Sequence, residues 1–320
     1  ACFKLWFLEE VMKVRHLLAI KDLDREDLDE IFALAADMKA NPERYGDALH
    51  NKTMAMIFEK SSTRTRVSFE CAMARMGGHA LFLSPKDTQL GRGETVSDTA
   101  QVLGRMVDII MARVFKHGDV VTLAEKSGVP VINGLSDYAH PCQALADYLT
   151  ILEHKGKFEG LRVVYVGDSN NNVTHSLMEC GALLGVSVDC ACPKGYYPAP
   201  EVVEWCREVG KKTGATFNVI EDPVEAVKGA DVIYSDVWVS MGVEHEKEQR
   251  LIDLHDYQVN LALFEKAKSD CIFMHCLPAH RGEEVTDDVC DHPRSVIFDE
   301  AENRLHAQAA LILCLFAAWK

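Results

Sequence analysis

The chain has 320 residues, a formal net charge of −15 and 48% apolar residues. This composition is typical of a soluble globular protein that is long enough for two domains. The acidic balance argues against nucleic acid as a partner, and no apolar run approaches the ~18 residues of a membrane-spanning helix. An acidic protein that binds an anion must gather its arginines at one place, so the arginines deserve the closest reading.

The cysteines further restrict the class of protein. Eleven are present, no CxxC pair occurs, and Cys190 and Cys192 have the closest spacing. This scatter is typical of reduced, mostly buried thiols and not of a disulfide framework or a zinc site. We therefore expect a cytoplasmic protein without a metal. The weakly apolar residues 2–8 lack the features of a signal peptide, and we interpret them as an extra N-terminal strand or as added residues.

The first elements are a helix, a buried strand and a second helix. Residues 22–39 have apolar positions at helical spacing, and Asp22 or Asp24 is placed to cap this helix. Residues 54–58 are all apolar and predict a buried strand, and residues 67–76 again have helical spacing.

The turn between that strand and the second helix, residues 60–66, reads Lys-Ser-Ser-Thr-Arg-Thr-Arg. A helix start offers N–H donors and the positive end of its dipole, so anions bind there. Hydroxyls add neutral donors, and an arginine can grip two phosphate oxygens at once. The alternative is a capped helix start with solvated arginines, because Ser and Thr are routine N-caps. Two arginines interleaved with hydroxyls favour phosphate binding.

The rest of the first half brings further polar residues to strand ends. We predict strands at residues 80–83, 108–114 and 129–133 and helices at residues 98–107 and 144–152. Arg113 lies near the end of its strand, where it either joins the anion site or makes a surface ion pair. His140 and Gln143 lie at a helix start that contains Pro141, a position where proline is expected. The polar segment 84–95 predicts a surface loop.

The pattern restarts after residues 155–160, a charged, glycine-bounded segment that we interpret as a hinge. We predict strands at residues 161–168, 186–192, 216–220, 231–236 and 271–274 and helices at residues 175–184, 202–209, 223–228 and 309–319. Strands that alternate with helices at this spacing predict a parallel sheet covered on both faces. The predicted fold class is therefore α/β, with two doubly wound domains whose parallel sheets are covered by helices. The last helix is apolar nearly all round and must be buried.

The turn after residue 166 reads Gly-Asp-Ser-Asn-Asn-Asn and lacks the GxGxxG of dinucleotide-binding proteins. Asparagine amides bind both amines and carboxylates, which suits an amino-acid ligand. Asp236 and Cys276 also lie at predicted strand ends. A buried aspartate needs a partner, and a cationic ligand is one candidate. Cys276 alone is equally consistent with a packed thiol.

Four motifs, SSTRTR, HPCQ, DVWVSMG and HCLP, occur in this order. Together they resemble the aspartate and ornithine carbamoyltransferases, and the resemblance extends from roughly His16 to the C-terminus. DVWVSMG and HCLP resemble the ornithine-specific members. The resemblance implies a carbamoyl-phosphate-binding domain at residues 1–153, an ornithine-binding domain at 154–300, and a C-terminal helix at 301–320 that packs back on the first domain.

The resemblance also implies the site residues. Those for carbamoyl phosphate are Ser62, Thr63, Arg64, Thr65, Gln89, Arg113, His140, Pro141, Cys142, Gln143, Cys276, Leu277 and Arg304. Those for ornithine are Asn172, Asp236, Ser240 and Met241, and the catalytic set is Arg113, His140, Asp236, His275 and Cys276. Asn171 stays an alternative to Asn172, because the turn holds one residue more than in many relatives. Gln89 is implied to reach a neighbouring subunit, with Lys86 as the alternative.

The implied reaction transfers the carbamoyl group of carbamoyl phosphate to the δ-amine of L-ornithine and gives L-citrulline and phosphate. It requires no cofactor and no metal, and the two domains are expected to enclose the site. A homotrimer or an assembly of trimers is implied, in arginine biosynthesis or catabolism. The alternative substrates are putrescine and an acylated ornithine. A non-catalytic paralogue is disfavoured because Arg64, His140 and Cys276 are all present.

Overall fold

The computed structural model describes residues 12–84, 86, 88–89, 93–239 and 244–319. The chain forms two compact units. Unit 1 comprises Ala1–Ala146 and Glu302–Lys320, and unit 2 comprises Asp147–Ala301. None of the described helices is both long enough and apolar enough to cross a membrane.

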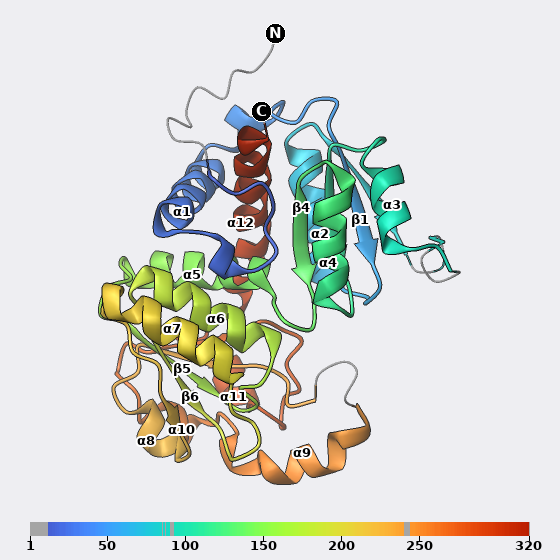
Figure 1. Cartoon of the computed structure of the whole chain (residues 1–320). Coiled ribbons are helices and arrows are strands. Elements are labelled where there is room, and N and C mark those ends of the chain that lie inside the picture. Colours follow the sequence, from blue (N-terminus) through green and yellow to red (C-terminus); the bar gives the residue numbers. More distant parts are fainter. Residues whose placement is uncertain (1–11, 85, 87, 90–92, 240–243, 320) are drawn as a thin grey trace. The chain divides into compact units, whose positions relative to one another are not determined.

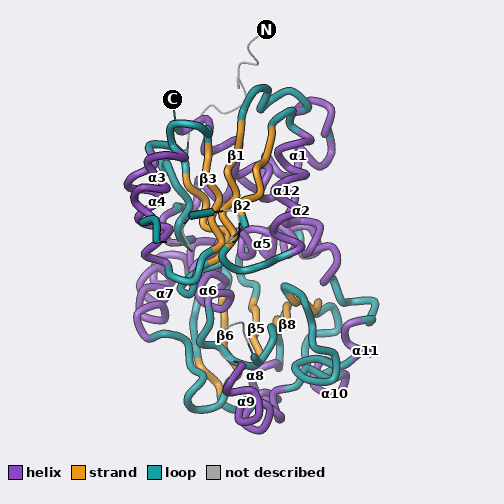
Figure 2. Tube along the Cα trace, turned by 90° about the vertical axis from the view of Figure 1, so that its right-hand side faces the viewer, coloured by secondary structure: helices purple, strands orange, loops and turns teal. Residues whose placement is uncertain are grey.

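Unit 1 is a four-stranded parallel sheet in the order β2-β1-β3-β4. Its strands are β1 (Thr53–Phe58), β2 (His79–Leu83), β3 (Ile109–Arg113) and β4 (Val131–Leu135). Its helices are η1 (Ile20–Asp22), α1 (Arg25–Ala40), η2 (Pro42–Tyr45), α2 (Thr63–Arg75), α3 (Val96–Leu103) and α4 (His117–Ser127), with the start of α5 (Pro141–Lys155) and most of α12 (Ile297–Ala318). In Figure 2, α3 and α4 cover one face of the sheet, and α1, α2 and α12 lie on the other.

Unit 2 is a five-stranded parallel sheet in the order β7-β6-β5-β8-β9. Its strands are β5 (Arg162–Val166), β6 (Ser187–Ala191), β7 (Val219–Ile220), β8 (Val232–Ser235) and β9 (Ile272–His275). Its further helices are α6 (Asn172–Leu184), α7 (Pro200–Thr213), α8 (Pro223–Val227), η4 (Glu244–Glu246), α9 (Lys247–Asp253), η5 (His255–Tyr257), α10 (Leu261–Phe264) and α11 (Asp287–Cys290). The pair α6 and α7 lies against the strands in Figure 1, and α8, α10 and α11 contribute to the core on the other face.

The predicted fold class is confirmed, since both sheets are parallel and covered by helices and the C-terminal helix belongs to unit 1. Its start was predicted wrongly, because α12 begins at Ile297 and not near residue 309. Glu300, Asn303 and Arg304 interrupt the apolar pattern there, yet all three are buried. The strand predicted at 216–220 is reduced to the two residues of β7. Asp24, and not Asp22, is the N-cap of α1.

Each sheet contains a point where the strand order reverses. In unit 1 the chain runs from β1 outward to β2 and then returns to β3 on the other side of β1. In unit 2 it runs from β5 outward through β6 and β7 and returns to β8 on the other side of β5. Ligands of open α/β sheets bind outside the carboxyl ends of the strands at such a point. The turns after β1, β3, β5 and β8 are therefore the positions to inspect.

Candidate active site

The predicted phosphate turn is the start of α2. Ser62 is the N-cap, and its Oγ accepts a hydrogen bond from Thr65 N (3.3 Å) and donates one to Thr65 Oγ1 (3.1 Å). Thr63 is exposed, Arg64 is half-buried and Thr65 is buried. The cap fixes the direction of the helix start, and the first N–H groups of a helix are the groups that anions bind.

Arg304, from α12, joins this turn to the start of α5. Its Nη1 donates to Gln143 Oε1 (2.7 Å), and its Nη2 donates to Thr65 Oγ1 (3.3 Å). Gln308 Oε1 accepts from Nε and Nη2 of the same guanidinium (3.1 and 2.9 Å). Arg304 is only 3% exposed. These acceptors of the buried guanidinium, on Gln143, Thr65 and Gln308, are all neutral oxygens.

Arg113 and His140 lie at the same edge of the sheet. Arg113 ends β3, where Phe58 at the end of β1 is its partner in the register, and it is 6% exposed. Burial, followed by the charges of Arg304, Arg113 and Arg64, holds the pKa of His140 well below its ordinary value. At neutral pH the imidazole is therefore uncharged, and it can donate a hydrogen bond without adding a further positive charge.

The other predicted residues of unit 1 differ in their surroundings. Pro141 and Cys142 are buried at the start of α5. The Cys142 thiol lies 3.5 Å from Asn133 O, and burial raises its pKa to about 12, so this thiol is an inert packing group. Gln89 and Lys86 are both exposed. Within the described part of unit 1, the structure brings together Thr65, Gln143 and Arg304 by hydrogen bonds, and Arg64, Arg113 and Arg304 around His140 by their charges.

In unit 2, Asp236 and Cys276 meet at the ends of neighbouring strands. Asp236 follows β8 and Cys276 follows β9, and the Cys276 thiol donates to Asp236 Oδ1 (3.0 Å). Burial raises the pKa of Asp236 above its ordinary value, and burial together with Asp236 raises that of Cys276 well above its own. The thiol therefore stays protonated at neutral pH. A buried carboxylate with a weak donor as partner is a suitable acceptor for an amine.

His275 is held from both sides. Its Nδ1 accepts from Leu277 N (2.9 Å), and its Nε2 lies 3.1 Å from Glu284 Oε1. A neutral imidazole that accepts at Nδ1 carries its proton on Nε2 and donates it to Glu284. Leu277 has φ of 57°, an uncommon left-handed conformation for a residue with a branched side chain. We did not predict Glu284, which lies nine positions after His275, because no local sequence pattern distinguishes it.

The turn after β5 shows how the three asparagines differ. Asn171 caps α6 through Oδ1, which accepts from Thr174 N (2.9 Å), and its Nδ2 donates to Tyr165 OH (2.9 Å). Asn172 is the first residue of α6 and is half-buried. Both ends of the Asn171 amide are therefore engaged within this turn.

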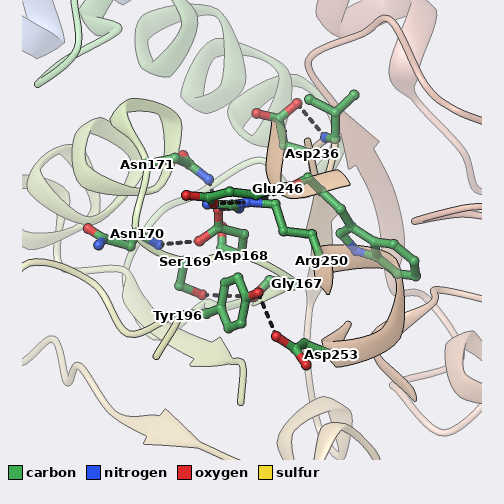
Figure 3. Close-up of polar contacts among 12 residues, drawn as sticks. Gly167, Asp168, Ser169, Asn170, Asn171, Tyr196, Asp236, Glu246, Arg250 and Asp253 are labelled. Atoms are coloured by element: carbon green, nitrogen blue, oxygen red, sulfur yellow. Dashed lines mark hydrogen bonds and ion pairs between the residues drawn. The ribbon is translucent and has the colours of Figure 1, made fainter. Parts of the chain in front are cut away.

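A residue that sequence reasoning missed holds this turn in place. Arg250, on α9, forms an ion pair with Asp168 and donates to Trp238 O (3.0 Å) and Glu246 Oε2 (2.8 Å). Figure 3 shows this guanidinium beside Tyr196 and the turn that contains Asp168. The stretch around Arg250 is a run of charged residues with no pattern that singles it out. Ser240 and Met241, which we predicted to bind ornithine, lie outside the described residues.

Ligand atoms of Asp236, His275 and Cys276 all lie within 4.8 Å of one another. Such a cluster has the composition of a metal site. Each member, however, already has a protein partner: Asp236 and Cys276 bond each other, and His275 bonds Glu284 and Leu277. These hydrogen bonds join the three side chains to one another and to Glu284 and Leu277.

The two units are both doubly wound. One has hydroxyl and basic side chains at a helix start, and the other has a buried carboxylate and a thiol at strand ends. These features are typical of an α/β enzyme. The chain matches the family model described as aspartate/ornithine carbamoyltransferase, carbamoyl-P binding domain, over residues 15–153. It matches the corresponding Asp/Orn binding domain over residues 159–315. The chain belongs to the aspartate/ornithine carbamoyltransferase family.

Relatives support the assignment over nearly the whole length. The ornithine carbamoyltransferase of Thermococcus kodakarensis is 55% identical over 311 residues, which are 96% of this chain and 98% of that protein. The Bacillus subtilis ornithine carbamoyltransferase is 55% identical over 93% of this chain and 92% of its own length. The solved structure of ornithine carbamoyltransferase from Pyrococcus furiosus covers 95% of this chain and 97% of its own with a TM-score of 0.91 at 55% identity.

Proposed function

We propose that this protein is an ornithine carbamoyltransferase, which transfers the carbamoyl group of carbamoyl phosphate to the δ-amine of L-ornithine and releases L-citrulline and phosphate. The observation that carries the proposal is the Asp236–Cys276 pair at the ends of β8 and β9. A buried carboxylate suits a cationic amino acid and would repel the dicarboxylate aspartate. Relatives named ornithine carbamoyltransferase at 55% identity support the same choice.

In unit 1, the proposed carbamoyl-phosphate residues are Ser62, Thr63, Arg64, Thr65, Arg113, His140, Gln143 and Arg304. Ser62–Thr65 offer a helix start to the phosphate, and Arg64 and Arg304 supply the positive charge. Arg113 and neutral His140 are suited to the carbamoyl oxygen, on which negative charge builds during attack. One preorganised donor at such a position typically contributes about 3 kcal/mol to transition-state stabilisation.

In unit 2, the proposed ornithine residues are Asn172, Asp236, Ser240 and Met241, with His275 and Cys276 in the catalytic set and Leu277 on the carbamoyl side. The δ-amine must be neutral to attack, although its pKa in water resembles that of lysine. Asp236 is placed to accept a hydrogen bond from this amine, and Cys276 holds the Asp236 carboxylate in position. The departing phosphate is the proposed final acceptor of the amine's proton.

The proposed carbamoyl-phosphate-binding domain comprises residues 1–153, and the proposed ornithine-binding domain comprises residues 154–300. The proposed C-terminal helix, residues 301–320, packs back on the first of these domains.

A citrulline assay with L-ornithine, putrescine and N-acetylornithine as acceptors tests the proposal. We expect turnover with ornithine and at least a hundredfold lower kcat/KM with either alternative, because putrescine lacks the α-carboxylate and N-acetylornithine carries a bulkier, uncharged amide in place of the α-amine. Preferential turnover of putrescine or acetylornithine would establish the alternative carbamoyltransferase. Absence of turnover with all three would point to a ligand-binding paralogue.

We also propose a cytoplasmic homotrimer, or an assembly of trimers, in which Gln89 serves a neighbouring subunit. Gln89 is exposed, and β2 at the sheet edge is partly exposed along its length, with Leu81 at 40%. A strand edge with apolar exposure favours contact with another chain.

A further inference from the structure

Behind the Asp236–Cys276 pair lies a second pair of acidic residues, which the proposed mechanism does not use. Asp147 on α5 and Glu300 on α12 both belong to unit 2, and both are completely buried. Their side chains are hydrogen-bonded to each other. Two carboxyl groups can share a hydrogen bond only when one of them carries a proton. Burial and the neighbouring Asp147 raise the pKa of Glu300 well above its ordinary value, so the proton resides on Glu300.

Glu300 is hydrogen-bonded to the two strands, β8 and β9, that directly precede Asp236 and Cys276. Its Oε2 accepts from His275 N (2.9 Å) at the end of β9, and its Oε1 accepts from Tyr234 OH (3.2 Å) on β8. His275 directly precedes Cys276, and Tyr234 lies two residues before Asp236. β9 is the edge strand of the sheet. The Glu300 carboxyl therefore supplies the hydrogen-bond acceptor that a further strand would otherwise offer to His275 N.

We propose that Glu300, kept as a neutral acid by Asp147, is a positioning residue for carbamoyl transfer that holds the ends of β8 and β9 so that Asp236 and Cys276 meet. This inference rests on the proposed function. Glu300 touches neither substrate in this proposal, and it acts through His275 N and Tyr234 OH. Its neutral form matters because a full charge at this position would lie next to the residues that bind a cationic amine.

The titratable groups that face Glu300 are Asp147 from α5, Tyr234 from β8, and Cys276 directly after β9, whereas His275 contributes its backbone N–H. The charges of both acids act on Cys276. With one proton the pair carries a single negative charge. Loss of that proton at high pH would place two negative charges behind Cys276, disrupt the Glu300–Asp147 bond and loosen the strand ends.

The decisive variants are Glu300→Gln, Glu300→Ala and Asp147→Asn. Gln keeps a carbonyl oxygen that can accept from His275 N and an N–H₂ group that can donate to Asp147 and to a rotated Tyr234 hydroxyl, so it mimics the neutral acid and cannot titrate. Ala removes every contact. In Asp147→Asn the new amide donates to Glu300, which then ionises and moves the negative charge towards Cys276. Glu302→Gln is the matched control, because Glu302 lies on the same helix but pairs only with His306 at the surface among the described contacts.

We would measure kcat and KM for both substrates from pH 6 to 10, together with thermal unfolding. Glu300→Ala should lose at least about tenfold in kcat with little change in KM for carbamoyl phosphate. Glu300→Gln should restore most of that loss and flatten the alkaline decline, whereas Asp147→Asn should be impaired at all pH values. The proposal is overturned if Glu300→Gln is as slow as Glu300→Ala while unfolding like the parent, or if Glu300→Ala keeps its kcat. If Glu300→Ala fails to fold, the kinetics of Glu300→Gln and Asp147→Asn relative to the parent decide whether the proposal stands.

The same measurements separate this inference from the proposed function. The parent is first assayed with ornithine, putrescine and acetylornithine, and the variants are then assayed with whichever amine the parent carbamoylates. If ornithine is not that amine, the proposed function fails, while the kcat pattern of the Glu300 variants still tests the positioning role.

Discussion

Arg64 and Arg66 stand two positions apart in α2, yet their surroundings differ. Arg66 donates to Glu70 (2.9 Å) and stacks 3.8 Å above the centre of the Phe82 ring. Arg64 is half-buried and acts electrostatically on His140. The two residues look equivalent in the SSTRTR motif, and only the structure assigns one to the surface and the other to the proposed phosphate site.

Arg64→Ala should raise KM for carbamoyl phosphate and lower kcat, because the phosphate contact is lost in both ground and transition states. A charge-assisted contact is worth about 1.5–3 kcal/mol, which corresponds to about a 10- to 100-fold effect. Steady-state kinetics measure it. Arg66→Ala is the control and should stay near the parent, and equal losses in the two variants would refute the assignment.

Cys276→Ser should weaken ornithine binding and move the alkaline dependence of kcat/KM, with the affinity for carbamoyl phosphate nearly intact. The pKa of the buried thiol lies above its ordinary value, so the thiol is protonated at neutral pH and loses its proton only well into the alkaline range. Ionisation would place a second negative charge against Asp236. A serine hydroxyl does not ionise there, so the alkaline loss should shift to higher pH. An unchanged pH profile in the variant would contradict this role.

Among the elements, the turns rather than the strands carry the chemistry. The strands β1, β5, β8 and β9 are short and almost wholly buried, whereas the turns after them hold many of the proposed site residues. The element α9 is unusual because Arg250 lies 82 residues after Asp168 and still bonds the turn after β5. Figure 3 shows that contact together with Glu246 and Asp253.

Arg250→Ala should raise KM for ornithine about tenfold and leave KM for carbamoyl phosphate unchanged, because the turn that precedes Asn172 loses its tether to Trp238 and Glu246. The partly buried pair with Asp168 makes this a larger effect than an exposed pair gives. Arg281→Ala, which breaks exposed pairs with Asp287 and Asp291, is the control. Equal KM values for ornithine in the two variants would remove Arg250 from the ornithine half.

Sequence patterns predicted the parallel strands well, because apolar runs of five residues bounded by glycine and polar residues have few other interpretations. They also predicted the turn at Ser62 and the residues at strand ends. They failed where a polar residue is buried by a partner far away in the chain. Glu300 in α12, Glu284 behind His275 and Arg250 against Asp168 are such cases. A local pattern cannot reveal them, because their partners lie 9 to 82 residues away.

At the scale of the whole molecule, the proposed sharing of sites between subunits is directly testable by hybrid formation. Arg64→Ala and Gln89→Ala are each expected to be nearly inactive alone. After the two variants are unfolded, mixed and refolded together, some interfaces of a mixed trimer pair an intact Arg64 with an intact Gln89 of the adjacent chain. Citrulline production should then recover in the mixture.

Each variant refolded alone under the same protocol is the control, and the presence of mixed trimers is verified with a charge-tagged subunit. If mixed trimers form and activity stays absent, Gln89 acts within its own chain.

The reversal of strand order in each sheet has a consequence for how such a molecule diversifies. The groups proposed for phosphate arise from turns of one sheet, and those proposed for the amine arise from turns of the other. Natural selection can therefore remodel the segments after β5, β8 and β9 and exchange one amine substrate for another. The proposed site for carbamoyl phosphate is then inherited unchanged. Protein engineers can follow the same route by grafting three short segments, without redesign of either scaffold.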